Sequence, residues 1–374
     1  MISSRFFAIF HVQILLGNLF WGTPFKWDRK TCTLFVTKKA YLRYCFSVTI
    51  LVLITSFWVF QVIRYKLLEK TADMSYAFTY ALMICGILDI FAASPTLRHA
   101  QYLASFFNNF TQIFEKLRRE YMPNFEPNVD CTNWFFDFII FSSTFSGPFC
   151  GLVIASHYFI YPQWPLYLTS LLPSDNLTFP YLISFGIFYF WFLQMIWAIL
   201  LLDFVIIVTV VRYGWLLTNE FHFGEQHGNK KYKTGPAFRK QENVQRNLRV
   251  LQILHLNALE IYSGVIIPLQ TVVTNLVIFC NFVIIRYWEI LTVLDISMLL
   301  IWIVLGNSLA VVGLTCCAML YQRSVKLKKS LRCHDWKTKA GNKLMAKFIK
   351  SVIPFRFGYG KMYVIRKKSV LKFL

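Results

Sequence analysis

Six long apolar stretches divide this chain, and shorter polar segments separate them. The stretches cover residues 45–62, 74–93, 135–161, 180–211, 261–285 and 287–321. A helix needs about 20 apolar residues to cross the hydrocarbon core of a bilayer, and each stretch is about that long or longer. The pattern predicts an all-α integral membrane protein, a helical bundle with six transmembrane helices.

The positively charged residues lie almost entirely on one side of these stretches. Lys and Arg number seven before the first stretch, four after the second, eight after the fourth and sixteen after the sixth. The other three gaps contain three, none and one. Cytosolic segments of membrane proteins carry the excess of Lys and Arg. The count predicts a multi-pass plasma-membrane protein whose N-terminus and C-terminus are both cytosolic.

The net charge of +21 would suggest a nucleic-acid partner if the protein were soluble. Here the mean hydropathy is +0.49, and the charge is confined to loops and tails that face anionic lipid headgroups. We therefore expect the lipid bilayer, and no nucleic acid, as the partner of this charge.

Three parts are expected along the chain. They are a cytosolic or interfacial segment at 1–44, the transmembrane bundle at 45–321 and a basic cytosolic segment at 322–374. Residues 6–20 are apolar enough to resemble a signal peptide. A small-residue cleavage site is missing, however, which favours an interfacial helix.

Two of the cytosolic segments carry apolar residues at helical spacing, which predicts helical extensions of the bundle. The spacing occurs at Leu103, Phe106, Phe107, Phe110, Ile113, Phe114 and Leu117, and again at Val244, Leu248, Leu251 and Leu254. The fourth apolar stretch is too long for a bilayer and is expected to project into the cytosol as well. Residues 224–236, rich in Gly and Lys, predict a loop.

The sequence lacks the usual signatures of catalysis. It has no Gly-rich phosphate loop, nucleophile elbow or Cys-x-x-Cys pair. The irregular spacing of His222, Glu225 and His227 favours a polar loop over a metal site. We expect no enzyme activity, no cofactor and no metal.

Carboxylates inside apolar stretches are costly, so each one needs a partner or a function. For Asp89, Asp137 and Asp203, positions at helix ends or hydrogen bonds to neighbouring helices are the favoured explanation, with Asp137 close enough to an end to reach water. For Asp295, in the outer half of the sixth stretch, a ligand cavity or ion path is an equally good explanation.

Aromatic residues make up 18% of the chain, and many lie in the outer halves of the apolar stretches. An apolar cavity with a few polar groups suits a small ligand that enters from outside, whereas contact with lipid is the alternative for each residue taken singly. The predicted ligand-binding residues are Tyr76, Tyr80, Phe149, His157, Tyr158, Phe188, Tyr189, Phe190, Trp191 and Asp295.

Three local signals complete the prediction. The outer loop at 162–179 has no Lys or Arg and contains the sequon Asn176-Leu177-Thr178, so Asn176 is a candidate for glycosylation. Gly147-Pro148 and the pair Gly264 and Pro268 are expected to kink their helices.

Two segments near the chain ends resemble a known family. Trp21-Gly22-Thr23-Pro24-Phe25-Lys26-Trp27-Asp28 resembles the region ahead of the first helix of arthropod gustatory and odorant receptors. Ser351-Val352-Ile353-Pro354-Phe355-Arg356-Phe357-Gly358 resembles the basic segment that leads into their last helix. The resemblance spans nearly the whole chain.

This resemblance implies a seven-helix chemoreceptor that is itself a ligand-gated cation channel. It implies a homo- or hetero-tetramer with related subunits, a pore made by the seventh helix, and an outer pocket for a small-molecule tastant or odorant. The family's last helix carries Thr-Tyr and then Gln-Phe, which are not found before Leu374. Residues 369–374 are expected to approach a seventh span, and no pore residue is assigned.

Two other classes of protein stay open. A G-protein-coupled receptor would expose its N-terminus outside the cell, so the accessibility of an N-terminal tag distinguishes it. A secondary transporter would use broken helices and buried acids, often with a repeat between halves. Substrate accumulation rather than ligand-evoked current distinguishes the transporter.

Overall fold

The computed structural model describes residues 4–68, 73–123, 131–173, 175, 177–223, 232–336, 339–359 and 363–365. Long helices dominate these residues, which confirms the predicted all-α class. The helices are α1 (Ser4–Leu19), α2 (Lys38–Leu67), α3 (Met74–Tyr121), α4 (Cys131–Ile160), α5 (Phe179–Glu220), α6 (Gln241–Tyr287), α7 (Val293–Cys333) and α8 (Lys339–Ser351), with short 3-10 turns η1 (Leu168–Leu171) and η4 (Pro236–Arg239). Two small antiparallel hairpins pair β1 (Phe25–Asp28) with β2 (Thr33–Val36) and β3 (Gly358–Tyr359) with β4 (Tyr363–Val364).

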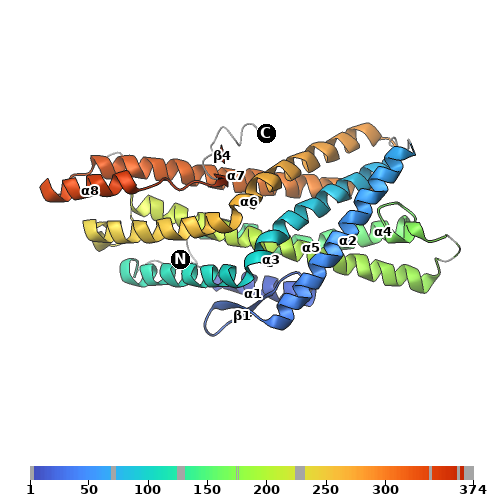
Figure 1. Ribbon diagram of the computed structural model, residues 1–374, viewed down its shortest axis with the longest axis horizontal. Helices are drawn as coiled ribbons and strands as arrows, with labels where there is room; N and C mark the ends of the chain where they lie inside the picture. Colours follow the sequence, from blue (N-terminus) through green and yellow to red (C-terminus); the bar gives the residue numbers. More distant parts are fainter. Residues whose placement is uncertain are drawn as a thin grey trace.

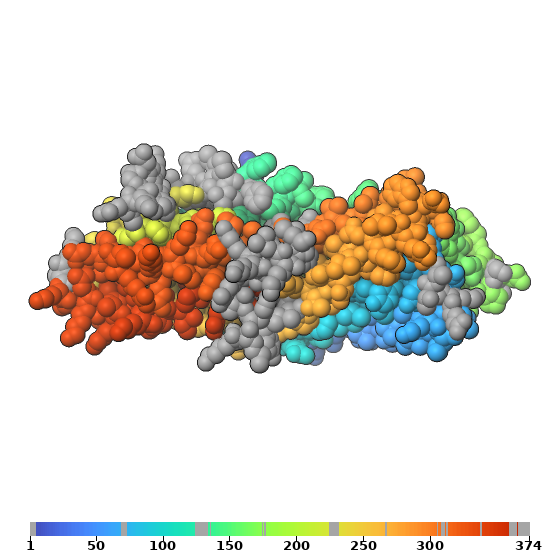
Figure 2. Space-filling model, turned by 90° about the horizontal axis from the view of Figure 1, so that it is seen from above, coloured from blue at the N-terminus to red at the C-terminus, as the bar shows by residue number. Residues whose placement is uncertain are grey.

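The bundle has two ends that differ in construction (Figure 1). At one end, on the right of Figure 1, α2, α4 and α6 end and α3, α5 and α7 begin; we call this the loop end. At the other end α3, α5, α6 and α7 continue together as helical extensions, and α8 lies beside them. Figure 2 shows α7 and α8 covering the extension end and α6 reaching the loop end.

Five helices in the described part of the chain are long and apolar enough to cross a membrane: Lys38–Leu67, Met74–Tyr121, Phe136–Ile160, Phe179–Glu220 and Pro268–Tyr287. The sixth predicted span began too early, because Tyr287 is the last residue of α6. A capping box between Thr292 and Asp295 starts α7 at Val293, and the apolar stretch described there, Val293–Val304, is shorter than a span.

The predicted helical extensions are confirmed. α3 runs on to Tyr121, and α6 begins at Gln241. Their apolar positions are buried in one cluster: Leu103, Phe106, Phe107, Phe110, Phe114 and Leu117 from α3, and Val244, Leu248, Leu251 and Leu254 from α6. The predicted loop at 224–236 lies mostly outside the described residues.

The predicted N-terminal helix is also confirmed, but the hairpin after it was not predicted. Phe10 of α1 stacks on Phe107 of α3 at 5.0 Å between ring centroids. The side chain of Asn108 holds the hairpin on α3, because its amide accepts from the N–H of Leu34 and donates to the carbonyl of Leu34, both at 2.7 Å. The segment 21–28 therefore leads into β1 and forms part of a hairpin docked on the extensions.

The structure shows the predicted bend in α6, a break in α3 that was not predicted, and a packing role for the glycine of α4. α3 is interrupted at His99 (φ −133°, ψ 31°), a break that the sequence analysis did not single out. Figure 1 shows α6 bending near its middle, the stretch that contains Pro268. In α4 the lack of a side chain at Gly147 lets α5 pack closely, because a Cβ at this position would lie 2.0 Å from the Trp197 ring of α5.

Residues 352–357, which we call the C-terminal strap, lie against α6 and α7. Lys328 of α7 donates to the carbonyl of Val352 (2.6 Å), and the N–H of Phe355 donates to Ser324 (3.0 Å). On α6 the Nε2 of His255 lies 3.0 Å from both the N–H and the carbonyl of Arg356, so it accepts from the first or donates to the second according to its tautomer. The His255 ring is buried under the strap, and this burial disfavours the charged imidazolium.

The strap is expected to make the extension end sensitive to acid. Burial lowers the pKa of His255 from 6.5 to about 4. His255 therefore becomes protonated below about pH 6.5 in the unfolded chain, but only below about pH 4 in the folded chain. The contribution of His255 to the free energy of unfolding is fully present above pH 6.5 and is lost as the pH falls toward 4. We expect the free energy of unfolding to decrease by about 2 kcal/mol from pH 7.5 to pH 5. Unfolding of the wild type and of His255→Gln at both pH values checks this, since the variant should lack the extra loss; equal losses would contradict it.

Candidate ligand site

A polar cluster around the fully buried side chains of His157 and Asp295 joins α4 and α7 at the loop end. Nε2 of His157 lies 3.1 Å from Oδ1 of Asp295, and Nδ1 of His157 lies 2.8 Å from the hydroxyl of Tyr167. The other carboxylate oxygen of Asp295 accepts from the N–H and hydroxyl of Thr292, at 2.9 and 2.7 Å. His157 and Asp295, both predicted to bind ligand, thus hydrogen-bond each other and their neighbours.

The α4–α5 loop closes over this cluster through aromatic contacts. The Tyr167 ring lies 4.9 Å from both Tyr158 of α4 and Tyr189 of α5, measured between centroids. The Tyr189 hydroxyl accepts from the N–H of Leu168 at 2.5 Å. Trp164 of the loop covers the His157 ring at 4.9 Å. The loop is therefore a fixed lid, and Tyr158 and Tyr189 belong to its seat.

The remaining predicted residues are dispersed over three places. Tyr76 and Tyr80 stack on α3 (6.3 Å), and Tyr80 contacts Phe279 of α6 (4.6 Å). Phe188, Phe190 and Trp191 are half-buried on α5, with partners Phe192, Phe20 and Trp21 respectively. Phe149 is 60% exposed, as expected of a lipid-facing side chain.

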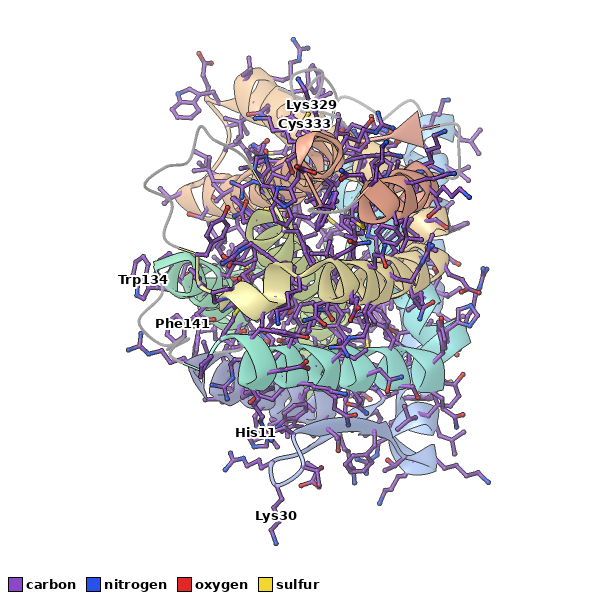
Figure 3. The ribbon with its side chains drawn as sticks, turned by 90° about the vertical axis from the view of Figure 1, so that its left-hand side faces the viewer. His11, Lys30, Trp134, Phe141, Lys329 and Cys333 are labelled. Carbon is purple, nitrogen blue, oxygen red and sulfur yellow. The ribbon has the colours of Figure 1, made fainter. Side chains whose placement is uncertain are left out.

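The outward face of α4 shows the same lipid-facing character. Trp134 and Phe141 point away from the bundle in Figure 3, and both are exposed. Phe138 and Phe145 continue the row, stacked at 5.6 Å on Trp134 and packed at 4.5 Å on Phe141. Contact with lipid, the alternative to ligand binding, therefore explains most of the aromatic residues of α4.

A cavity of about 100 Å³ lies at the centre of the bundle, and six helices contribute to its wall. We call it the central cavity. Its described lining residues are Trp58 (α2), Leu82, Cys85, Leu88 and Asp89 (α3), Cys150 and Ile154 (α4), Leu193, Ile196, Trp197 and Leu200 (α5), Val273 and Leu276 (α6), and Trp302 and Gly306 (α7). None of the ten predicted ligand residues is among these described lining residues.

Two tryptophans of the wall are fixed by hydrogen bonds that point away from the cavity. The indole N–H of Trp58 donates to the carbonyl of Leu166 in the lid (2.9 Å), and that of Trp197 donates to Ser143 of α4 (2.9 Å). Both rings are therefore held in place without using a donor inside the cavity. The bond to Leu166 also connects the wall directly to the lid.

The structure shows how three acids of the apolar stretches, Asp89, Asp137 and Asp203, are accommodated. Asp137 was expected to reach water, but it is buried and paired with Arg212 of α5 at 3.2 Å. Asp203 accepts from the Tyr262 hydroxyl of α6 (3.1 Å), the predicted kind of interhelical bond. Asp89 lies well inside α3 rather than at a helix end, and it is 2% exposed. Cys85 and Asp89 are four residues apart, so they lie on the same face of α3, and both line the central cavity. This spacing was the sign in the sequence that could have placed Asp89 there.

A second cavity of about 150 Å³ adjoins the first, toward the strap. It shares Leu88, Leu200 and Val273 with the central cavity and reaches Asp203 and Phe357. In the described part of the chain, no group of three or more His, Cys, Asp or Glu could hold a metal ion. Asn176, Glu225 and His227 lie outside the described residues.

Comparison with solved structures identifies the architecture. The insect olfactory receptor OR5 from Machilis hrabei superposes with a TM-score of 0.64 over 98% of this chain and 94% of that chain. This chain has the fold of an insect olfactory receptor. The sequence identity is 13%, and the structure of the same receptor in complex with eugenol matches equally well. No family model and no curated protein sequence matches the chain.

The olfactory-receptor fold agrees with the resemblance drawn from the two end segments. In the structure the first segment leads into the hairpin on the extensions, and the second forms the strap on α6 and α7. Both segments thus contribute to the extension end, away from the central cavity. The resemblance predicted the architecture correctly, although at this level of identity the likeness is one of fold.

Proposed function

We propose that this chain is a chemosensory receptor that binds a small external ligand in the central cavity and acts as a subunit of a ligand-gated cation channel. The observation that carries the proposal is a cavity walled by six helices within the olfactory-receptor fold. The structural relative bound to eugenol is a receptor for a small, largely apolar molecule. The likeness favours this function over a coupled receptor or a transporter.

The size and chemistry of the cavity support a small ligand. Apolar cavities of about 150 Å³ admit one benzene-sized molecule. The central cavity is somewhat smaller and adjoins the second one, so a ring with a short substituent is the expected occupant. The fixed Trp58 and Trp197 rings give that occupant aromatic walls.

The membrane orientation is part of the same proposal. Lys and Arg concentrate in the segments that build the extension end, which we place in the cytosol together with the N-terminus. The lid and the central cavity then lie toward the outer side of the plasma membrane, and the sequon at Asn176 would be open to glycosylation. Assembly as a tetramer of identical or related subunits, for an odorant or a tastant, completes the proposal.

Filling the central cavity is expected to abolish the response. Leu193→Trp adds an indole inside the wall and should lower ligand-evoked current at least about ten-fold, because ligand and indole compete for one space. The measurement is whole-cell current from cells expressing the full chain, with a panel of small aromatic alcohols, phenols, aldehydes and amines that includes eugenol.

The matched control is Leu152→Trp, the same change at a position on α4 that is 58% exposed. It should keep the current within about two-fold, since surface substitutions usually cost little. Equal responses in both variants, or no response to any compound from surface-expressed wild type, would contradict the proposed function.

A further inference from the structure

Asp89 is the one acid among the described residues of the central cavity wall. Its carboxylate belongs to a residue that is 2% exposed, and its Oδ1 has no hydrogen-bond partner among the described residues. The contrast with Asp137, Asp203 and Asp295 is direct, because each of those has a partner in the structure.

An isolated carboxylate in an apolar interior is unfavourable unless something compensates it. The described wall contains no Lys, Arg or His that could do so. Either a bound proton or a group that occupies the cavity must then neutralise this carboxylate. A group that donates hydrogen bonds and carries positive charge compensates a carboxylate best, because charge-assisted bonds are about twice as strong as neutral ones.

The rest of the wall suits the same group. Trp58, Trp197 and Trp302 line the cavity with Asp89, and indole faces attract cations. The indole N–H groups of Trp58 and Trp197 are already bonded to backbone carbonyls, so they offer a ligand their rings rather than donors. Aliphatic side chains, two cysteines and Gly306 complete the wall and match an apolar body.

We propose that Asp89 makes the central cavity selective for small protonated amines, with the ammonium group at the Asp89 carboxylate and a compact apolar body between the tryptophans. This inference rests on the proposed function, since it names the class of ligand for that site. A phenol or alcohol could donate one hydrogen bond to Asp89 but would leave the negative charge uncompensated. A divalent cation is disfavoured because the described wall offers one oxygen ligand residue where such ions need several.

Three compounds of nearly equal shape test the proposal: 2-phenylethylamine, 2-phenylethanol and propylbenzene. The purified full chain in lipid nanodiscs is titrated with each near neutral pH, where the amine is protonated. The readout is the rise in the thermal unfolding midpoint with ligand concentration, which gives an apparent dissociation constant without a label. The amine is expected to bind at least about ten-fold more tightly than either neutral compound.

Two variants assign the preference to Asp89. Asp89→Asn keeps the size of the side chain and removes its charge, so the three compounds should then bind within about three-fold of one another. Asp203→Asn makes the same chemical change at another buried acid and should keep the amine preference. Measuring the neutral compounds in Asp89→Asn also verifies that the variant folds and still has its cavity.

Each outcome has one meaning. Equal binding of all three compounds to the wild type overturns the inference and leaves the proposed function standing. An amine preference that survives Asp89→Asn, or that disappears in Asp203→Asn, overturns the inference as well. If none of the three compounds raises the midpoint of the wild type, the central cavity is not a site for small aromatic ligands, and both proposals fail.

Discussion

Replacing Arg212 by methionine is expected to lower the free energy of unfolding by about 3 to 5 kcal/mol. The side chains of Arg212 and Asp137 are 3% and 7% exposed, and Nη1 lies 3.2 Å from Oδ1. The guanidinium also lies over the Phe136 ring at 5.7 Å. Removing it takes the ion-pair partner from the buried Asp137 carboxylate, and the attraction that offset the desolvation of that charge is lost.

The measurement is the unfolding of the purified protein in detergent, followed by tryptophan fluorescence. The double variant Asp137→Leu with Arg212→Met is the control, because apolar residues in place of both charges are often tolerated where a single removal is not. It should recover most of the lost stability. A shift below about 1 kcal/mol for the single variant would indicate that water reaches Asp137, as the sequence analysis had expected.

Replacing Asp295 by alanine is expected to cost about 3 kcal/mol. Two interactions disappear together. Loss of the capping box with Thr292 costs about 1 kcal/mol, and leaving Nε2 of His157 buried without a partner costs about 1 to 3 kcal/mol. The lid would loosen as a consequence, because His157 also positions Tyr167.

Asp295→Asn is the matched variant, since its amide oxygen can still accept from Thr292 or from His157. It should lose less than half as much stability as the alanine variant. Thermal unfolding and ligand-evoked current, measured on the same variants, separate two roles for this residue. If Asp295→Ala unfolds like the wild type but loses its ligand response, Asp295 contacts ligand as first predicted and is not a structural cross-link.

The candidate site was predicted in its general character and not in its residues. Aromatic density and buried acids indicated an apolar pocket with few polar groups, and the central cavity has that composition. Among the acids, however, Asp295 was preferred over Asp89, although the structure gives Asp295 two partners and Asp89 none that is described. A sequence shows that an acid lies in an apolar stretch, but it does not show which acid finds a partner.

The lid provides a second example of the same limit. His157, Tyr158 and Tyr189 do gather near the loop end, as the prediction placed them. What they contact is Tyr167 and Leu168, from a loop that the sequence analysis considered only as a site of glycosylation. His157 and Tyr189 consequently make their hydrogen bonds to the protein, and the cavity forms farther into the bundle.

The sequence by itself determined which segments are helices, which of them are apolar enough for a membrane, and which face of each extension is buried. These properties depend on residues three or four positions apart, as at Leu103, Phe107 and Phe110, so the local order of residues contains them. Only the tertiary structure decided which side chains meet. Arg212 pairs with a residue 75 positions away and His157 with one 138 positions away, and six helices enclose Asp89. Such partners and cavities depend on how whole helices cross and on what space their side chains leave unfilled, and no local pattern records either.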